Sequence, residues 1–374
     1  MSIVGKRESG VDYIIPFAKM RGETSFASIA RLKRLLGTRK VGHTGTLDSF
    51  ADGLLVAVSG KLTRLASFIE ARCKRYEALL IFGSETDTLD PTGEVVKRAC
   101  LPTYASVENS LDSFVGYIMQ MPPVFSALHV NGKRASDIVR SGGDVSLERR
   151  EVEIKAIVVK GVLFAGDDAF VDAVHLEGCE ERLVKELHVE VECSKGTYIR
   201  ALARDIGEKV GSAAHLKALR RLSVGCFSLQ DAFRFSALPS FLNEERVSPF
   251  IAEQACEVEH SAMITEKRQD MLKFAKEFSP SLCEELGFPV VDIKEKFVKS
   301  FVQGKEIKDA WFYNHKEENI SHSSAGFGTN GKSYDMEEKR CEILKKGVVF
   351  VFFEDELLGA ITLEASRYKY KFVM

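Results

Sequence analysis

The spacing of apolar residues predicts a helix near the N-terminus. Thr24 or Ser25 can cap its first turn, and Gly37 directly follows its last apolar residue, which is how helices commonly begin and end. Between these limits the apolar residues recur at helical spacing: Phe26, Ile29, Ala30, Leu32, Leu35 and Leu36. One face of this helix is therefore expected to be buried, while its basic side faces solvent.

Further apolar patterns predict strands mixed with short helices. Residues 54–58 are a short apolar run, which is typical of a buried strand. Every second residue is apolar in the segments 76–82 and 187–193, so each set of side chains shares one face of a strand. The second of these strands leads into a helix over residues 199–210, which Gly211 ends. Strands and helices in this irregular order predict an α+β domain.

The pattern changes beyond about residue 240. Residues 348–353 and 357–363 are two apolar runs separated by three acidic residues, and they predict a β-hairpin. The composition of residues 321–333, rich in Ser and Gly, predicts a flexible insertion. Since 374 residues are enough for about two domains, we expect one domain over residues 1–240 and a small β-rich domain over residues 241–374.

Charge is distributed unevenly, although the formal net charge is only −2. Residues 1–150 and residues 193–240 each carry a net charge of +5, whereas residues 151–192 carry −7 and residues 241–374 carry −5. A basic face on an otherwise neutral protein is typical of phosphate binding. Residues 130–150 combine glycines with basic residues and predict a mobile arm between strands.

The cysteines and the N-terminus indicate the cellular compartment. No two of the eight cysteines lie closer than fourteen positions, which fits neither a zinc site nor a disulfide framework. Reduced thiols are typical of cytoplasmic proteins. The N-terminus lacks the apolar segment of a signal peptide, and no apolar run approaches the ~18 residues of a membrane-spanning helix. We therefore expect a cytoplasmic protein that does not enter a membrane.

The most informative segment is a loop of glycines and threonines that ends on an acid. It has the sequence Gly-His-Thr-Gly-Thr-Leu-Asp over residues 42–48 and leads into the apolar segment 51–55. Glycine permits backbone angles and close approaches that a side chain would block. Loops on a rigid scaffold carry many catalytic residues. The segment therefore predicts a shaped loop that presents the carboxylate of Asp48.

This segment resembles the signature motif of the TruB family of tRNA pseudouridine synthases. Five further blocks are similar to that family and follow its order: residues 74–77, 83–93, 122–127, 193–200 and 219–222. Ordered blocks are far more specific than a single motif. The resemblance covers about residues 10–235. It implies a mixed, largely antiparallel sheet flanked by helices, a thumb-like insertion at about residues 122–153 and a C-terminal domain of the PUA kind.

The resemblance also implies roles for individual residues. Asp48 corresponds to the catalytic aspartate of the family, and His43 to the histidine that helps to capture the target nucleotide. Arg200 corresponds to an arginine of the family, and a guanidinium beside Asp48 would favour the ionised carboxylate. That carboxylate can act as a nucleophile or as the base that starts a glycal route.

Three more residues are expected to shape the pocket. A uridine must leave its helical stack before an enzyme can reach its C1′ atom. Tyr76 can stack on the flipped base, a contact worth ~1–3 kcal/mol. Tyr198 and Leu219 look like walls of the same pocket. The alternative for these residues, as for His43, is plain packing in the core.

We therefore expect an isomerase that converts uridine to pseudouridine at position 55, in the T-loop of tRNA. The reaction breaks the bond between ribose C1′ and uracil N1, turns the base and rejoins it through C5. It requires no redox change and no group donor, so no cofactor and no metal are expected. The expected partner is the T-arm of tRNA, and the chain is expected to act as a monomer.

Three residues depart from the family pattern. Met20 and Ser49 stand where prolines are common, which frees the local backbone without removing chemistry. Ser136 stands where the thumb of the family commonly has tyrosine, so an RNA contact or the packing of the thumb differs there. None of the expected site residues is altered.

Three other functions compete with this interpretation. A tRNA-binding or tRNA-folding factor would keep the fold, but it does not need an acid that faces a phosphate ligand. Related synthases that are guided by separate RNAs share the acidic loop and depend on accessory proteins. A glycoside hydrolase normally needs two placed carboxylates, and Asp52 or Asp87 would have to supply the second.

Overall fold

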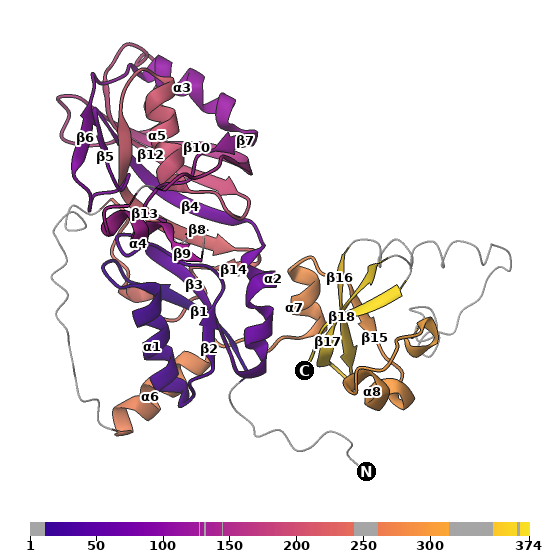
Figure 1. The fold of residues 1–374 in the computed structure, drawn as a ribbon. Helices are drawn as coiled ribbons and strands as arrows, with labels where there is room; N and C mark the ends of the chain where they lie inside the picture. The colour runs from indigo at the N-terminus through magenta and orange to yellow at the C-terminus, as the bar shows by residue number, and fades with distance from the viewer. Residues whose placement is uncertain are drawn as a thin grey trace, which may run out of the picture. The chain divides into compact units, whose positions relative to one another are not determined.

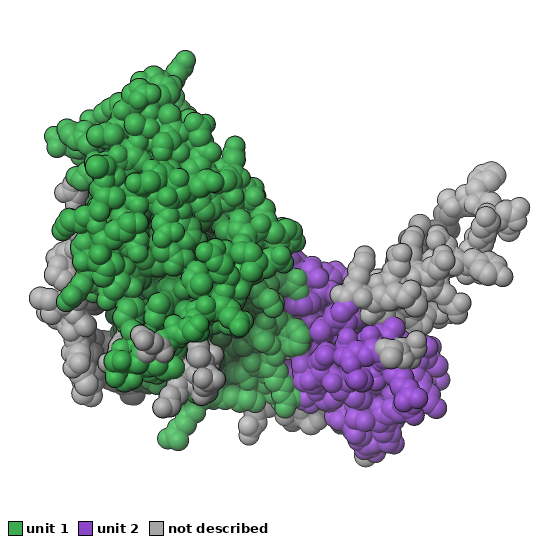
Figure 2. Space-filling model, turned by 45° about the horizontal axis from the view of Figure 1, so that its top comes forward, with its two compact units in different colours: residues 1–11, 15–275 green, residues 12–14, 276–374 purple. Residues whose placement is uncertain are grey.

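The computed structural model describes residues 12–126, 128–130, 132–143, 145–242, 261–313, 347–364 and 367–374. The chain divides into two compact units (Figure 2). Unit 1 comprises residues 1–11 and 15–275, and unit 2 comprises residues 12–14 and 276–374. Among the described residues, no helix is long and apolar enough to cross a membrane.

A ten-stranded mixed sheet forms the centre of unit 1 (Figure 1). Its main path runs in the order β1 (Ile14–Lys19), β3 (Asp52–Ser59), β13 (Ala214–Val224), β4 (Lys74–Phe82), β12 (Val184–Cys193), β10 (Arg150–Phe164) and β11 (Val171–Asp172). Three strands pair beside this path: β2 (Val41–His43) on β3, β7 (Gly116–Gln120) on β10 and β14 (Phe227–Ser228) on β13. The pairing of β3 with β13 is parallel. From β13 through β4 and β12 to β10, each strand is antiparallel to the next. The expected mixed, largely antiparallel sheet is thus confirmed.

In the described part of unit 1, six α-helices and two small hairpins accompany this sheet. The helices are α1 (Ser25–Leu36), α2 (Ala66–Glu70), α3 (Tyr104–Leu111), α4 (Ala135–Arg140), α5 (Ile199–Lys209) and α6 (Ser261–Leu272). The hairpins are β5 (Ser84–Thr86) with β6 (Val95–Arg98), and β8 (His129–Val130) with β9 (Lys133–Arg134). The second hairpin and α4 lie within the predicted thumb-like insertion. The helix α6 belongs to unit 1, although it lies beyond residue 240.

The predicted helix near the N-terminus is confirmed as α1, with one correction. Thr24 caps it by accepting a hydrogen bond from the backbone N–H of Ala27, and Gly37 follows it at a φ of 66°. Phe26, however, is 76% exposed, and the buried face carries Ser25 and Ser28 in its place. Both serines make hydrogen bonds that an apolar side chain could not make. Local polar contacts thus decide which face of the first turn is buried.

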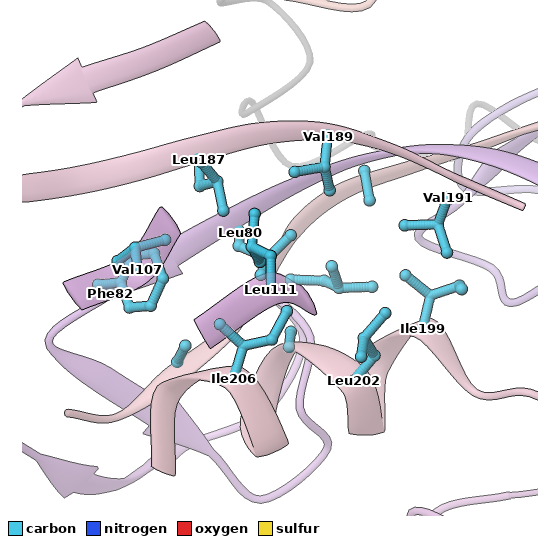
Figure 3. Packing of buried hydrophobic residues seen from close by; sticks show 14 of the residues in the cluster. Leu80, Phe82, Val107, Leu111, Leu187, Val189, Val191, Ile199, Leu202 and Ile206 are labelled. Carbon is cyan, nitrogen blue, oxygen red and sulfur yellow. The ribbon is translucent and has the colours of Figure 1, made fainter. Parts of the chain in front are cut away.

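The core of unit 1 lies between one face of the sheet and two helices (Figure 3). Leu80 and Phe82 on β4 and alternate residues of β12 point toward α3 and α5, as the sequence pattern predicts. The opposite face of β12 is buried in part: His188 is 7% exposed and stacks on Phe241, whereas Glu190 and Glu192 are partly exposed. A helix after β12 is also confirmed, and Gly211 follows it at a φ of 69°.

Unit 2 contains a four-stranded sheet in the order β15 (Val290–Asp292), β16 (Val348–Phe353), β17 (Glu356–Glu364) and β18 (Arg367–Val373). Its helices are α7 (Pro280–Glu285) and α8 (Glu295–Val302). The predicted hairpin is confirmed as β16 and β17. Glu354 and Asp355 connect the two strands, both with positive φ, as a tight turn between twisted strands requires. The predicted flexible insertion, residues 321–333, lies outside the described residues.

Candidate active site

The loop that ends on Asp48 is held in place by the segment between β1 and α1. The Ser25 hydroxyl donates to the carbonyl of Leu47 (2.9 Å) and accepts from its N–H (3.0 Å). The N–H of Gly22 donates to the carbonyl of Ser49 (2.7 Å). These bonds flank Asp48 on both sides, so the backbone fixes the position of its carboxylate.

Lys19 supports the same loop from the end of β1. Its ammonium group donates to the carbonyls of Ala51 (2.7 Å) and Glu23 (2.7 Å), and its side chain is fully buried. Burial lowers the pKa of Lys19 to about 8, while the charges of Asp52, Glu23 and Asp48 raise it in part. Lys19 therefore lies beneath the loop with part of its hydration removed.

Arg221 on β13 is a second buried cation beneath the loop. It is 1% exposed, and its guanidinium donates to the carbonyls of Leu54 (2.7 Å), Gly45 (3.2 Å) and Thr46 (3.3 Å). Gly53 has a φ of 110°, and a Cβ atom there would lie 2.5 Å from the carbonyl oxygen of Arg221. Only glycine lets β3 and β13 approach this closely.

Arg200 on α5 contacts Asp48 directly. Its Nε atom lies 2.9 Å from Oδ2 of Asp48, and the Asp48 side chain is 40% exposed. The same guanidinium donates to the carbonyls of Thr88 (2.7 Å) and Phe125 (3.0 Å) and lies 3.4 Å from Oδ2 of Asp90. The Arg200 side chain itself is 6% exposed. An exposed carboxylate is thus paired with a buried, fixed cation, as the sequence suggests.

The loop between β5 and β6 completes the surroundings of Arg200. The buried carboxylate of Asp90 accepts hydrogen bonds from the Thr88 hydroxyl (2.8 Å) and from the N–H of Thr92 (2.9 Å). Between them Leu89 has a φ of 60°, which is an unusual backbone conformation for a bulky residue. Asp90 is therefore rigidly placed, and it neutralises part of the charge of Arg200.

The two tyrosines of the expected pocket both lie near Asp48. Tyr76 on β4 is 7% exposed, and burial raises its pKa to about 12, while the charge of Arg221 lowers it in part. Tyr198, at the N-terminus of α5, is half-buried, and burial raises the pKa of its hydroxyl too. The negative charge of Asp48 contributes to both shifts. Both phenols are therefore neutral at physiological pH.

His43 and Leu219 are the remaining two residues of the expected site, and both are largely shielded from solvent. Burial and the charge of Arg221 lower the pKa of His43 at the end of β2, so its imidazole is neutral at neutral pH. Leu219 on β13 is 6% exposed and belongs to the main core cluster together with Tyr76. The structure thus brings Asp48 and Arg200 into contact, while Leu219 is a core residue.

Three residues that hold this site are not apparent from the sequence: Lys19, Asp90 and Arg221. Each lies in a segment that the resemblance covers, yet each role depends on contacts that are distant in the sequence. Two signals were available. Asp90 lies in a loop rich in Thr and Asp, and arginines 220 and 221 are adjacent in a block that resembles the family; both are buried on β13.

The described residues contain no group of three or more His, Cys, Asp or Glu side chains placed to hold a metal ion.

Comparisons with known proteins match nearly the whole chain. The family model of the N-terminal domain of TruB family pseudouridylate synthases matches residues 33–199, and the model of the C-terminal domain of tRNA pseudouridylate synthase B matches residues 200–252. A protein of Treponema denticola named tRNA pseudouridine synthase B is 42% identical over 98% of this chain and 99% of its own length. A protein of the same name from Treponema pallidum strain Nichols is 37% identical over 82% of this chain and 88% of its own length.

Solved structures share the fold at much lower identity. The structure titled "Crystal Structure of a Cbf5-Nop10-Gar1 Complex" aligns with a TM-score of 0.56 and 18% identity, covering 96% of this chain and 84% of that chain. "Structure of H/ACA RNP bound to a substrate RNA containing 2'-deoxyuridine" aligns with a TM-score of 0.52 and 18% identity over the same shares. At this identity the likeness shows the fold alone.

Proposed function

The chain belongs to the TruB family of pseudouridylate synthases, and we propose that Asp48 carries out its reaction on the uridine at position 55 of the tRNA T-loop. The chain is an isomerase that converts uridine in tRNA to pseudouridine. The bond between ribose C1′ and uracil N1 breaks, and a bond between C1′ and C5 forms. N1 gains a proton and C5 loses one, so substrate and product are isomers.

One observation favours Asp48 over the other acidic residues as the reacting carboxylate. It is 40% exposed and therefore accessible to substrate, yet one oxygen is fixed 2.9 Å from the Nε atom of a buried arginine. A nucleophile and a general base both need an accessible and oriented oxygen, and the contact with Arg200 orients this carboxylate. Asp52, by contrast, is 2% exposed and paired with Arg220 at 2.7 Å. A substrate cannot reach that carboxylate, so the pair of acids that a glycoside hydrolase needs is not formed by Asp48 and Asp52.

The tyrosines near Asp48 suit a base that has left its stack. We propose that Tyr76 forms the aromatic floor on which the flipped uracil stacks and that Tyr198 forms a wall. Both phenols are neutral, so neither repels the carboxylate of Asp48. His43 is proposed to hold the vacated position in the RNA, for which a neutral imidazole at the end of β2 is suited. Leu219 would contribute through the apolar core behind Tyr76.

The remaining assignments rest on the family resemblance. The partner is proposed to be the T-arm of tRNA, bound by a monomer in the cytoplasm. Residues 122–153 are proposed to act as a thumb on the RNA, and residues 241–374 as a PUA-like domain beside a catalytic domain of residues 1–240. Because the chain is proposed to act alone, its activity must not depend on guide RNA or accessory proteins.

The experiment is to incubate the purified chain with an unmodified tRNA transcript and to map pseudouridine in the product. We expect pseudouridine at position 55, and a loss of more than about 10⁴-fold in rate for Asp48→Asn, as when the acting group of an enzyme is removed. The matched control is Asp87→Asn, an exposed acid that accepts a hydrogen bond from the N–H of Glu94.

The outcomes separate the alternatives. Undiminished product from Asp48→Asn would contradict the assignment of the carboxylate. Binding of tRNA without any product from the wild-type chain would support a binding or folding factor. Product that appears only with added guide RNA and accessory proteins would support the guided class.

A further inference from the structure

Gln120, the last residue of β7, makes two hydrogen bonds to a single residue of the site. Its Oε1 atom accepts from the backbone N–H of Tyr198 (2.8 Å), and its Nε2 atom donates to the carbonyl of Tyr198 (3.1 Å). Gln120 is 1% exposed. A buried primary amide that uses both its donor and its acceptor on one residue is a specific clamp.

The backbone of Tyr198 has few other local restraints, although its hydroxyl also interacts with the side chain of Ser126. It occupies the N-cap position of α5, and its side chain makes no capping hydrogen bond. The chain before it contains the exposed Gly196 at a φ of 81°, and a Cβ atom there would meet open space. The Tyr198 carbonyl accepts the first bond of the helix from the N–H of Leu202 (3.0 Å). The Gln120 amide therefore fixes the peptide units on both sides of the Tyr198 side chain.

The segment after Gln120 has further anchors on α5. Arg204 donates to the carbonyl of Met121 (2.9 Å), and Arg200 donates to the carbonyl of Phe125 (3.0 Å). These bonds involve other groups and would remain in a chain that lacks the Gln120 amide. Loss of the amide should therefore affect the placement of Tyr198 more than the attachment of residues 121–125.

We propose that Gln120 is a positioning residue for the isomerisation, which it supports by fixing Tyr198 at the wall of the uridine pocket. The proposal rests on the proposed function, in which Tyr198 contacts the target nucleotide. Gln120 itself does not touch the reacting atoms. A displacement of about 1 Å in a group that orients a substrate can cost about 100-fold in rate. The effect should appear in the chemical step rather than in tRNA affinity, because Gln120 is buried and does not itself contact the RNA.

The first test is Gln120→Met, which keeps the volume of the side chain and removes both hydrogen bonds. We expect the single-turnover rate at saturating enzyme to fall by about 10- to 100-fold, while the Kd for tRNA changes less than about threefold. The matched control is Ser212→Ala. It removes a buried hydrogen bond to the carbonyl of Cys100 (2.7 Å) beyond the other end of α5. This control should lower the Tm while the rate stays near the wild-type value.

The second test measures the coupling between Gln120 and Tyr198. If Gln120 acts through Tyr198, then Gln120→Met should cost little further rate in a Tyr198→Leu background. An equal fold-loss in both backgrounds would mean a general structural effect and would overturn the proposal. So would a wild-type rate for Gln120→Met.

A third variant keeps the proposal testable if Gln120→Met fails to fold. In Gln120→Glu a protonated carboxyl group, the form that burial favours, has the same donor and acceptor as the amide. We expect it to restore most of the rate, and a folded variant that binds tRNA but reacts as slowly as Tyr198→Leu would overturn the proposal. Failure of the proposed function would show differently, because the wild-type chain would then be inactive or Asp48→Asn would stay active.

Discussion

The two units of the chain bury very different side chains. Unit 1 buries charged residues around its site, among them Lys19, Asp52, Asp90, Arg200, Arg220 and Arg221. In the described part of unit 2, Thr362 is the only buried side chain that carries a polar group other than a thiol or an indole. Unit 2 relies instead on ring contacts, such as Phe297 stacked on Trp311 with ring centroids 5.5 Å apart.

This difference shows where the burial of charged side chains lowers the stability of the chain. Burying a charge is unfavourable unless partners replace the lost water. In unit 1 these partners are the backbone carbonyls of the Asp48 loop and a few fixed carboxylates, so the contacts that stabilise the fold also hold the site. The described part of unit 2 has an apolar core that includes Phe301, Trp311 and Ile361. Mutations in the two units should therefore separate stability from activity.

Among the substitutions that compare the two units, the largest effect is expected for Arg200→Lys. A lysine keeps the charge, but its ammonium group cannot reach Asp48, Asp90 and the carbonyls of Thr88 and Phe125 together. We expect the single-turnover rate to fall by about 100-fold and the free energy of unfolding to fall by about 3 kcal/mol. Denaturant unfolding and pseudouridine formation measure the two effects.

The control is Arg182→Lys in the same unit. Arg182 pairs with Asp167 at 2.6 Å, but the two side chains are 39% and 30% exposed. Such pairs contribute less than about 1 kcal/mol, so we expect little change in either measurement. If the two substitutions had equal effects, the buried contacts of Arg200 would have no special role.

The sequence predicts most elements of both units because their apolar patterns agree with the final burial. The alternation on β4, the hairpin of β16 and β17 and the helix α1 all follow this rule. Phe26 breaks it, because Ser25 and Ser28 take the buried positions of the first turn for their hydrogen bonds. Periodicity describes which residues prefer burial, but not which polar contacts override that preference.

The site is less predictable than the fold for a related reason. Asp48 and Arg200 are found through motifs that are read along the chain. Lys19 and Arg221 act on backbone carbonyls, and any residue type can supply a carbonyl. No pattern of side chains therefore marks their partners. Asp90 cannot be recognised from the sequence, because its partner Arg200 lies 110 positions away.

A smaller effect on activity, with a comparable loss of stability, is expected for Ile361→Ala in unit 2. Ile361 is fully buried on β17, and such truncations cost about 2–5 kcal/mol. Since no proposed site residue lies in unit 2, the single-turnover rate should change less than about threefold under conditions where the chain stays folded.

The matched truncation in unit 1 is Leu202→Ala. Leu202 is 2% exposed on α5, the helix that carries Arg200. We expect a similar loss of stability together with a clear loss of rate. Equal losses of rate from the two truncations would show that unit 2 takes part in the chemical step.

The smallest expected effect is a pH dependence of the free energy of unfolding, which arises from buried lysines of unit 1. Burial lowers the pKa of Lys19 from 10.5 in the unfolded chain to about 8, so the unfolded chain binds more protons between these values. Stability therefore rises as pH increases from about 8, by at most about 1.4 kcal/mol per pH unit for each such group. Lys74, whose pKa is also lowered to about 8, acts in the same direction.

Above pH 10 the raised pKa of Tyr76 acts in the opposite direction, because the unfolded chain then loses its phenol proton first. Burial also raises the pKa of Cys193 from 9.0 to about 12, which opposes the lysines from about pH 9, so the useful window is pH 8 to 9. Urea unfolding across this window should show a smaller slope for Lys19→Met than for the wild-type chain, although the variant is less stable at every pH. Lys308→Met, at an exposed position in unit 2, should keep the wild-type slope. An unchanged slope for Lys19→Met would mean that its ammonium group is not desolvated beneath the Asp48 loop.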